Sequence, residues 1–195
     1  MQKSSICRTE EALGMGWKTA LSLFIIGFLL GVFVGVSISP ETNIPTTTPE
    51  STIVSGVYFS PRGGCENQII YWISRANSSI HILIYSFTLD SIGNALIEAY
   101  SRSVEVKIVF EKSQIGQGSE YQRLHSNDIE VRNDTNPDFM HDKTMIVDGK
   151  VVLTGSFNWS SNAEDSNNEN LIVIISPSVA GTYENEFDKI WNNAI

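Results

Sequence analysis

The sequence contains few cysteines. Of its 195 residues only Cys7 and Cys65 carry a thiol, and a long apolar run separates them. Because that run is predicted below to cross a membrane, the two thiols lie in different compartments and cannot pair within one chain. An internal disulfide framework is therefore excluded. Three interpretations of Cys65 stay open: a small buried side chain, a cross-link between two chains, or a free thiol.

Basic residues are scarce as well. The chain has 13 Lys and Arg against 22 Asp and Glu, which gives a formal net charge of −9. This balance excludes a broad basic face of the kind that binds nucleic acid. A polyanionic substrate would need a local positive pocket, and its binding would depend steeply on salt. The acidity is otherwise typical of a surface that keeps a protein soluble.

Charged residues are absent from residues 19–39, TALSLFIIGFLLGVFVGVSIS. As a helix this segment would be about 31 Å long, which matches the hydrocarbon core of a bilayer. It is predicted to be a transmembrane helix that acts as an uncleaved signal anchor. A cleaved signal peptide is the alternative, but the apolar run is longer than the usual signal core and VSISP is a poor cleavage site.

The charges around this segment predict its orientation. Basic residues precede it and acidic residues follow it: Lys3, Arg8 and Lys18 before, Glu41 and Glu50 after. Since Lys and Arg keep a flank in the cytoplasm, residues 1–18 are predicted to be cytoplasmic and the rest of this single-pass protein to lie on the extracytoplasmic side. Residues 40–52 are rich in Pro and Thr and are predicted to form an extended stalk. Residues 53–195 suffice for one globular domain.

The globular part alternates two hydrophobic patterns. Short apolar and β-branched runs predict strands at 52–59, 79–87, 104–110, 128–134 and 169–175. Apolar residues at helical spacing predict helices around 69–76, 92–100 and 119–127, and a closing helix after Pro177. Strands that alternate with crossover helices predict an α/β fold with helices on both faces of the sheet.

A hairpin interrupts this alternation. In KTMIVDGKVVLTG, residues 143–155, two short apolar runs flank Asp148 and Gly149. An Asp-Gly pair suits the tight turn of a two-residue hairpin. The sheet is therefore predicted to be mixed, although largely parallel.

Polar side chains of several chemical kinds gather around this hairpin, in HDKTMIVDGKVVLTGSFNWS. By strand alternation His141 and Lys143 share one face, and Ser156 and Asn158 follow the returning strand. A phosphodiester requires groups of these kinds: a nucleophile or base, a fixed cation, and neutral donors around the non-bridging oxygens.

This spacing resembles the signature of the phospholipase D superfamily, which is His-x-Lys, four residues, Asp, six residues, then Gly-Ser and a nearby Asn. The chain matches it with His141, Lys143, Asp148, Gly155, Ser156 and Asn158. Six specified positions would coincide by chance with odds on the order of one in a million. Glu169, in NNENLIVII, matches a further family feature, and residues 58–88 are similar to the opening of the small Nuc-type nucleases.

The resemblance implies a phosphohistidine mechanism in a homodimer. Family members with two motifs bring two such histidines together, and this chain has a single His-x-Lys, so the active site is expected at a two-fold interface. One His141 attacks phosphorus, and its symmetry mate protonates the leaving oxygen and then activates water. Lys143 and Asn158 hold the phosphoryl oxygens with help from Ser156. Glu169 accepts a hydrogen bond from the second ring nitrogen of His141.

The roles of three further residues follow less directly. Asp148 is expected either to act in the site or to have a structural role at the turn. His81 and His125 are expected to be structural. Neither a metal nor another cofactor is expected, because the chain lacks a Cys/His cluster.

Three functions compete at this point. A membrane-anchored, metal-independent endonuclease is favoured by the single motif, the small size and the Nuc-like opening. The alternative is a phospholipase D-type hydrolase that acts on phospholipids of the bilayer that holds it. A binding module that retains the fold is the third, but a pure binder has no need of the histidine.

Overall fold

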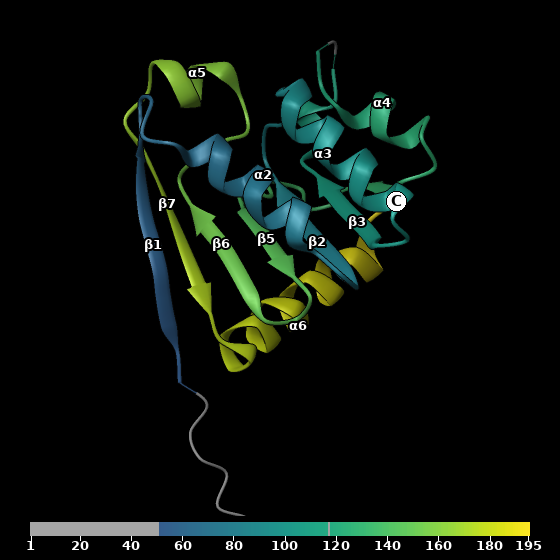
Figure 1. The fold of residues 1–195 in the computed structure, drawn as a ribbon. Coiled ribbons are helices and arrows are strands. Elements are labelled where there is room, and N and C mark those ends of the chain that lie inside the picture. The colour runs from purple at the N-terminus through teal and green to yellow at the C-terminus, as the bar shows by residue number, and fades with distance from the viewer. Residues whose placement is uncertain (1–50, 117) are drawn as a thin grey trace, which may run out of the picture. The chain divides into compact units, whose positions relative to one another are not determined.

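The computed structural model describes residues 51–116 and 118–195. The predicted transmembrane helix, the predicted cytoplasmic segment before it and most of the predicted stalk lie outside these residues. Within the described part, no helix is both long enough and apolar enough to cross a membrane. The described residues form an α/β domain, as the sequence predicts (Figure 1).

A seven-stranded sheet forms the centre of the domain, with the strand order β1-β7-β6-β5-β2-β3-β4. Its strands are β1 (Ile53–Ser60), β2 (Ser79–Ile84), β3 (Glu105–Phe110), β4 (Glu130–Asn133), β5 (Lys143–Val147), β6 (Val151–Gly155) and β7 (Glu169–Ile175). Each predicted strand is present, with ends that shift by a few residues. The predicted hairpin is formed by β5 and β6, which turn at Asp148 and Gly149.

The strand directions differ from the prediction. Strands β2, β3 and β4 are parallel, but β5 runs antiparallel to β2, and the pairs β5·β6, β6·β7 and β1·β7 are antiparallel as well. The sheet is mixed, and the expectation that it is largely parallel is wrong. The reason is the short connection 134–142, which contains no helix. A parallel crossover needs a dozen or more residues, so β5 starts beside the end of β2 and runs back.

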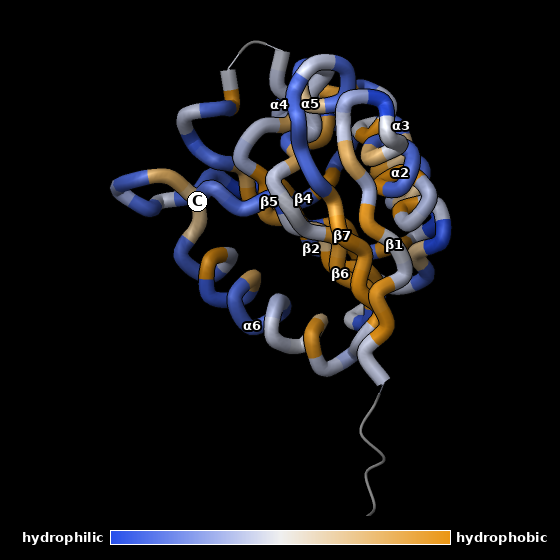
Figure 2. Tube along the Cα trace, turned by 90° about the vertical axis from the view of Figure 1, so that its left-hand side faces the viewer, coloured by the Kyte–Doolittle hydropathy of each residue, from blue (hydrophilic) through white to orange (hydrophobic). Residues whose placement is uncertain are grey.

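Helices cover both faces of the sheet, as predicted. Helices α2 (Cys65–Arg75) and α3 (Asp90–Ser101) pack on one face, and α6 (Pro177–Asn193) packs on the other. Figure 2 shows the sheet between α6 and the pair α2 and α3. Three shorter helices complete the domain: η1 (Lys112–Gln114), α4 (Tyr121–His125) and α5 (Ser161–Asp165).

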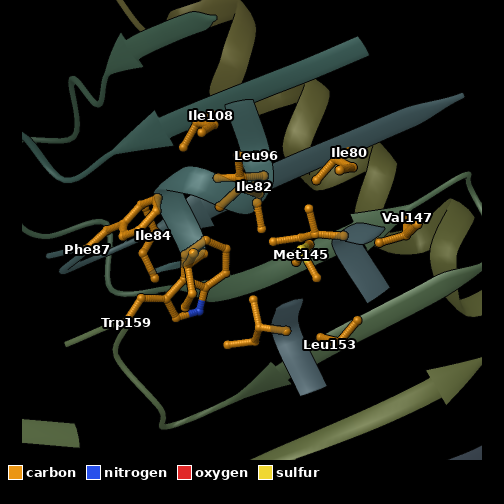
Figure 3. Close-up of a cluster of buried hydrophobic side chains, with 14 of the residues drawn as sticks. Ile80, Ile82, Ile84, Phe87, Leu96, Ile108, Met145, Val147, Leu153 and Trp159 are labelled. Carbon is orange, nitrogen blue, oxygen red and sulfur yellow. The ribbon is translucent and has the colours of Figure 1, made fainter. Parts of the chain in front are cut away.

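Alternation along β2 fills a core on each face of the sheet. Ile80, Ile82 and Ile84 belong to the larger core under α2 and α3, and Leu83 belongs to the smaller core under α6. Figure 3 shows the larger core, where side chains from β2 meet those of neighbouring elements, among them Phe87, Leu96, Met145, Leu153 and Trp159. Full burial of such a side chain stabilises the fold by roughly 1.5–3 kcal/mol.

Cys65 begins α2 and is fully buried in the larger core. Burial, with a contribution from the nearby carboxylate of Glu164, raises the pKa of its thiol to about 11. A thiol that is inaccessible and protonated at neutral pH does not form cross-links. Of the three interpretations of Cys65, the small buried side chain therefore fits the structure.

His81 on β2 joins α6 to the sheet. Its Nδ1 lies 2.6 Å from a carboxylate oxygen of Glu184 on α6, and its Nε2 lies 3.1 Å from one of Glu105 on β3. The ring also stacks on Phe187, with 4.6 Å between centroids. Burial alone would lower the pKa of His81, but the two carboxylates outweigh it and raise that pKa. Both ring nitrogens are thus occupied, as expected of a structural histidine.

Candidate active site

His141 lies two residues before the start of β5, at the end of the sheet where β2 finishes. Its side chain is exposed, and its ring packs against that of Tyr85 with 4.4 Å between centroids. The backbone beside it is fixed, because the N–H of Tyr85 donates a 2.9 Å hydrogen bond to the carbonyl oxygen of Asp142. The imidazole is therefore both accessible and supported.

Lys143, the first residue of β5, brings an ammonium group to the same place. Its side chain is buried, with only 6% of the residue exposed. The Nζ donates a 2.8 Å hydrogen bond to the carbonyl oxygen of His141 and lies 3.3 Å from Nδ1 of the same residue. Burial lowers the pKa of Lys143, although the carboxylates of Asp142 and Glu169 oppose this effect. A desolvated cation in such a position attracts an anion strongly.

The end of β6 approaches β7 so closely that only glycine fits at residue 155. A Cβ there would lie 2.1 Å from the carbonyl oxygen of Asn170. Beyond Gly155, the N–H of Ser156 donates to the carbonyl oxygen of Asn170 at 3.1 Å and to its Oδ1 at 3.2 Å. The Ser156 hydroxyl accepts a 3.1 Å hydrogen bond from the N–H of Asn170. Ser156 is thus held in place by β7.

Asn158 follows two residues later and carries an unusual polar atom. Its Oδ1 is buried and has no hydrogen-bond partner among the described residues. Buried polar atoms are nearly always paired, and an unpaired one costs about 1–3 kcal/mol. This oxygen is an acceptor, and the part of the same amide that can donate to the oxygens of an anion is Nδ2.

Glu169, the first residue of β7, brings a carboxylate. One of its carboxylate oxygens accepts a 3.2 Å hydrogen bond from Nδ2 of Asn167, and its N–H donates to the hydroxyl of Ser60 at 3.2 Å. In the described chain its carboxylate makes no hydrogen bond to His141, whose Nδ1 faces Lys143 instead. The predicted bond between Glu169 and His141 stays a prediction.

These side chains line one pocket of about 250 Å³, formed by His141, Lys143, Gly155, Ser156, Asn158 and Glu169. The structure thus brings together five of the six predicted site residues. A second hollow of about 420 Å³ lies between residues 134–142 and α6 and shares His141 with the pocket. Within the described ranges, no group of three or more His, Cys, Asp and Glu side chains is arranged to hold a metal ion.

Asp148 is the predicted site residue that the structure keeps apart. It lies at the hairpin turn, at the opposite end of β5 from the pocket, and five residues of strand at about 3.3 Å each separate the two. Its carboxylate accepts hydrogen bonds from the N–H groups of Asn77, Ser78 and Ser79 at 3.1, 2.8 and 3.1 Å. Of the two roles expected for Asp148, a role in the site does not fit this position. The structural role at the turn agrees with the geometry.

Two residues beside the pocket were not predicted from the sequence. Tyr85 supports the imidazole ring, and Asn170 holds Ser156. Both occupy strand ends next to the hairpin, Tyr85 after β2 and Asn170 within β7. The only signal in the sequence is a polar or amphipathic side chain at the end of a buried run, which is too common to identify them.

The domain matches known proteins at the level of family, sequence and structure. The family described as "Cardiolipin synthase, PLD-like domain" matches residues 69–191. The chain is 31% identical over 144 residues to the mitochondrial cardiolipin hydrolase of Chlamydomonas reinhardtii, which covers 67% of this chain and 65% of that relative. It is 37% identical over 140 residues to a phospholipase D of Rickettsia prowazekii, covering 70% and 68% of the two chains.

A solved structure shares the fold. The crystal structure of Nuc, a phospholipase D family member from Salmonella typhimurium, superimposes with a TM-score of 0.70 and 35% sequence identity. The match covers 74% of this chain and 97% of Nuc. Nuc is therefore similar over nearly its full length, whereas this chain spans about two thirds of the curated relatives above.

Proposed function

The chain belongs to the phospholipase D superfamily and is a phosphodiesterase of the hydrolase class, and on this premise we propose that it is an endonuclease that cleaves nucleic acid through a phosphohistidine intermediate. The observation that carries the proposal is the pocket, where the imidazole of His141, the buried ammonium of Lys143 and the polar side chains of Ser156 and Asn158 line a space of about 250 Å³. The likeness to Nuc over 97% of its length supports a nucleic acid as the substrate.

We propose that the active unit is a homodimer. The pocket contains a single imidazole, whereas in-line transfer through a phosphohistidine needs a nucleophile on one side of phosphorus and an acid on the other. A two-fold axis beside His141 supplies the second imidazole from the partner chain. Each chain then contributes half of one site.

The outer face of β1 is the surface that the partner would cover. Because of a register shift at Ser55, three apolar residues of β1 lie on the same side of the sheet as α6. They pair with alternate residues of β7: Val54 with Ile174, Val57 with Ile172, and Phe59 with Asn170. Yet α6 does not cover them, because the three β1 side chains are 55%, 49% and 62% exposed. In Figure 2, parts of β1 are orange, which marks hydrophobic residues at this edge of the sheet. This apolar patch, formed by Val54, Val57 and Phe59, lies close to the pocket. Phe59 pairs with Asn170, whose N–H donates a hydrogen bond to Ser156 in the pocket.

The proposed reaction has two steps. In the first, a ring nitrogen of His141 forms a bond to phosphorus while the bond to the leaving oxygen breaks, and the partner's imidazolium gives that oxygen a proton. In the second, the partner imidazole takes a proton from water, whose oxygen displaces His141 from phosphorus. Lys143, Asn158 and Ser156 hold the non-bridging oxygens in both steps. Glu169 stabilises the imidazolium form of His141.

Two observations favour phospholipids as the alternative substrate. Phe139 is 61% exposed and lines the hollow that shares His141 with the pocket. The relatives in Chlamydomonas and Rickettsia are a cardiolipin hydrolase and a phospholipase D. The predicted anchor at 19–39 would hold the domain close to a bilayer on its extracytoplasmic side. A lipid-cleaving enzyme would use the same imidazole and ammonium groups.

The test uses the full chain in detergent, with EDTA and low salt. Single-stranded DNA, plasmid DNA and cardiolipin vesicles serve as substrates for wild type and for His141→Ala. The matched control is His125→Ala, because His125 is an exposed histidine on α4 and does not line the pocket. We expect DNA cleavage that His141→Ala abolishes and His125→Ala retains.

The other outcomes separate the alternatives. Release of phosphatidic acid from vesicles without DNA cleavage would replace the nuclease with the phospholipase. DNA cleavage that survives in His141→Ala would contradict the nucleophile. A fully active monomer in sedimentation would contradict the homodimer.

A further inference from the structure

The segment that carries His141 is held by the end of β3. The N–H of Asp134 donates a 2.9 Å hydrogen bond to the carbonyl oxygen of Phe110, the last residue of β3. The Nζ of Lys112 donates to the carbonyl oxygens of Asn136 and Asp138, the second at 2.9 Å. Residues 134–142 contain no helix or strand of their own. Besides local hydrogen bonds to Asp134 and Asn136 within the segment, these contacts to groups outside it fix its course.

Glu111 makes the most buried of these contacts. It follows β3 directly and is fully inaccessible. One carboxylate oxygen accepts a 3.0 Å hydrogen bond from the N–H of Ser113, and the other accepts a 2.8 Å bond from the N–H of Met140. Burial alone would raise the pKa of Glu111, but these N–H groups outweigh it and hold that pKa below its usual range. The carboxylate is thus ionised when it binds Met140.

The bond to Met140 fixes the backbone on one side of His141. On the other side, the carbonyl oxygen of Asp142 accepts the bond from the N–H of Tyr85. The carbonyl oxygen of His141 itself accepts from Lys143. Since a side chain starts from its own backbone, these anchors on three consecutive residues, 140 to 142, set the position of the imidazole.

We propose that Glu111 is a positioning residue that holds His141 in the orientation needed for attack on phosphorus, an inference that rests on the proposed role of His141 as the nucleophile. Glu111 does not line the pocket, its carboxylate is hydrogen-bonded to the N–H groups of Ser113 and Met140, and it acts through the peptide of Met140. A loop residue without such an anchor would move by an ångström or more, and a misplacement of that size costs about 100-fold in rate.

A purely structural role explains Glu111 less well. Both hydrogen bonds of its carboxylate stabilise the fold, but they end at different places. The bond to Ser113 is local and only caps η1. The bond to Met140 spans 29 residues and ends next to the proposed nucleophile.

The test compares Glu111→Gln with Glu120→Gln in the full chain in detergent. Glutamine has the size of glutamate but offers one oxygen, so an amide NH₂ faces one of the two N–H donors. Glu120 is a matched control: it is 3% exposed and hydrogen-bonded to Arg123, and it does not line the pocket. The substrate is bis(4-nitrophenyl) phosphate, a small phosphodiester.

We expect Glu111→Gln to lower kcat by about 10- to 100-fold with KM within about two-fold of wild type. Glu120→Gln should keep the wild-type kcat. Wild-type kcat in Glu111→Gln would overturn the proposal. Equal losses in both variants would also overturn it, because that result would show a general effect of disturbing buried carboxylates.

A second readout does not need activity. The chain has three histidines, so the imidazole signals of His81, His125 and His141 can be resolved by NMR. We expect Glu111→Gln to shift the signals of His141 alone, while Glu120→Gln leaves them in place. If wild type hydrolyses no phosphodiester, the proposed function fails, and unchanged His141 signals in Glu111→Gln would then reject the positioning role separately.

Discussion

The polar groups at the two ends of the β5–β6 hairpin differ in how far the fold itself pairs them. At the turn, the carboxylate of Asp148 accepts hydrogen bonds from three successive N–H groups and from the hydroxyl of Ser78. At the pocket, Lys143 is desolvated with its ammonium beside the imidazole of His141, and that histidine is exposed. The difference shows where the fold uses polar groups for its own stability and where it leaves them for a ligand.

The pocket end should show the largest effect in a functional assay. Lys143→Met removes the cation but keeps the length of the buried side chain. We expect kcat to fall by about 100- to 1,000-fold, as for loss of one strong electrostatic contact to a transition state. Thermal unfolding should change little or rise, because the variant no longer buries a charge. A variant that loses stability and retains turnover would break the comparison.

The turn end should show the reverse. Asp148 adopts a left-handed backbone with φ of 53°, and asparagine tolerates that conformation. Asp148→Asn therefore removes the charge and keeps the turn. Urea unfolding at pH 7 should show a loss of about 1–2 kcal/mol in the free energy of unfolding, with kcat unchanged per folded molecule.

The pH dependence of Asp148→Asn sharpens this test. Burial alone would raise the pKa of Asp148, but the N–H donors of residues 77–79 hold it below its usual range. A lowered folded-state pKa stabilises the protein above the unfolded pKa of about 3.9, and this contribution is lost as pH falls through the folded pKa. The gap between wild type and variant should therefore close in acid. A constant gap would show that the charge is not responsible.

His81 extends the comparison to a histidine whose ring nitrogens are both occupied, and we expect the smallest effect there. Its pKa is raised by Glu184 and Glu105. Its contribution to stability is fully present below the unfolded pKa of about 6.5 and is lost as pH rises through the higher folded value. In His81→Gln this loss should disappear from the stability curve, whereas His125→Gln should retain it. An identical pH slope in wild type and His81→Gln would contradict this assignment.

The motif in the sequence identified most of the residues that line the pocket, because it specifies residue types that must lie together for the chemistry. His141, Lys143, Ser156, Asn158 and Glu169 line one space. It left the role of Asp148 open, since spacing along the chain does not measure distance when a strand of five residues lies between two motif positions. Glu111, Tyr85 and Asn170 carry no pattern of their own, and their contacts appear only when distant strands are placed side by side.

The fold followed a similar rule. Periodicity located every strand, because alternation and apolar runs are local properties. It did not give the strand directions. These depend on the antiparallel pairing of β1 with β7 and of β5 with β2. Those are long-range pairings, and a local pattern contains no information about them.

The anchoring of the hairpin from its far end has a consequence for how such a protein changes over time. Because Asp148 secures the hairpin away from the pocket, substitutions at the rim of the pocket leave the network that stabilises the turn untouched. Chemistry and folding are then separate targets of selection. New substrate preferences can accumulate at the rim of one scaffold without loss of the domain that carries them.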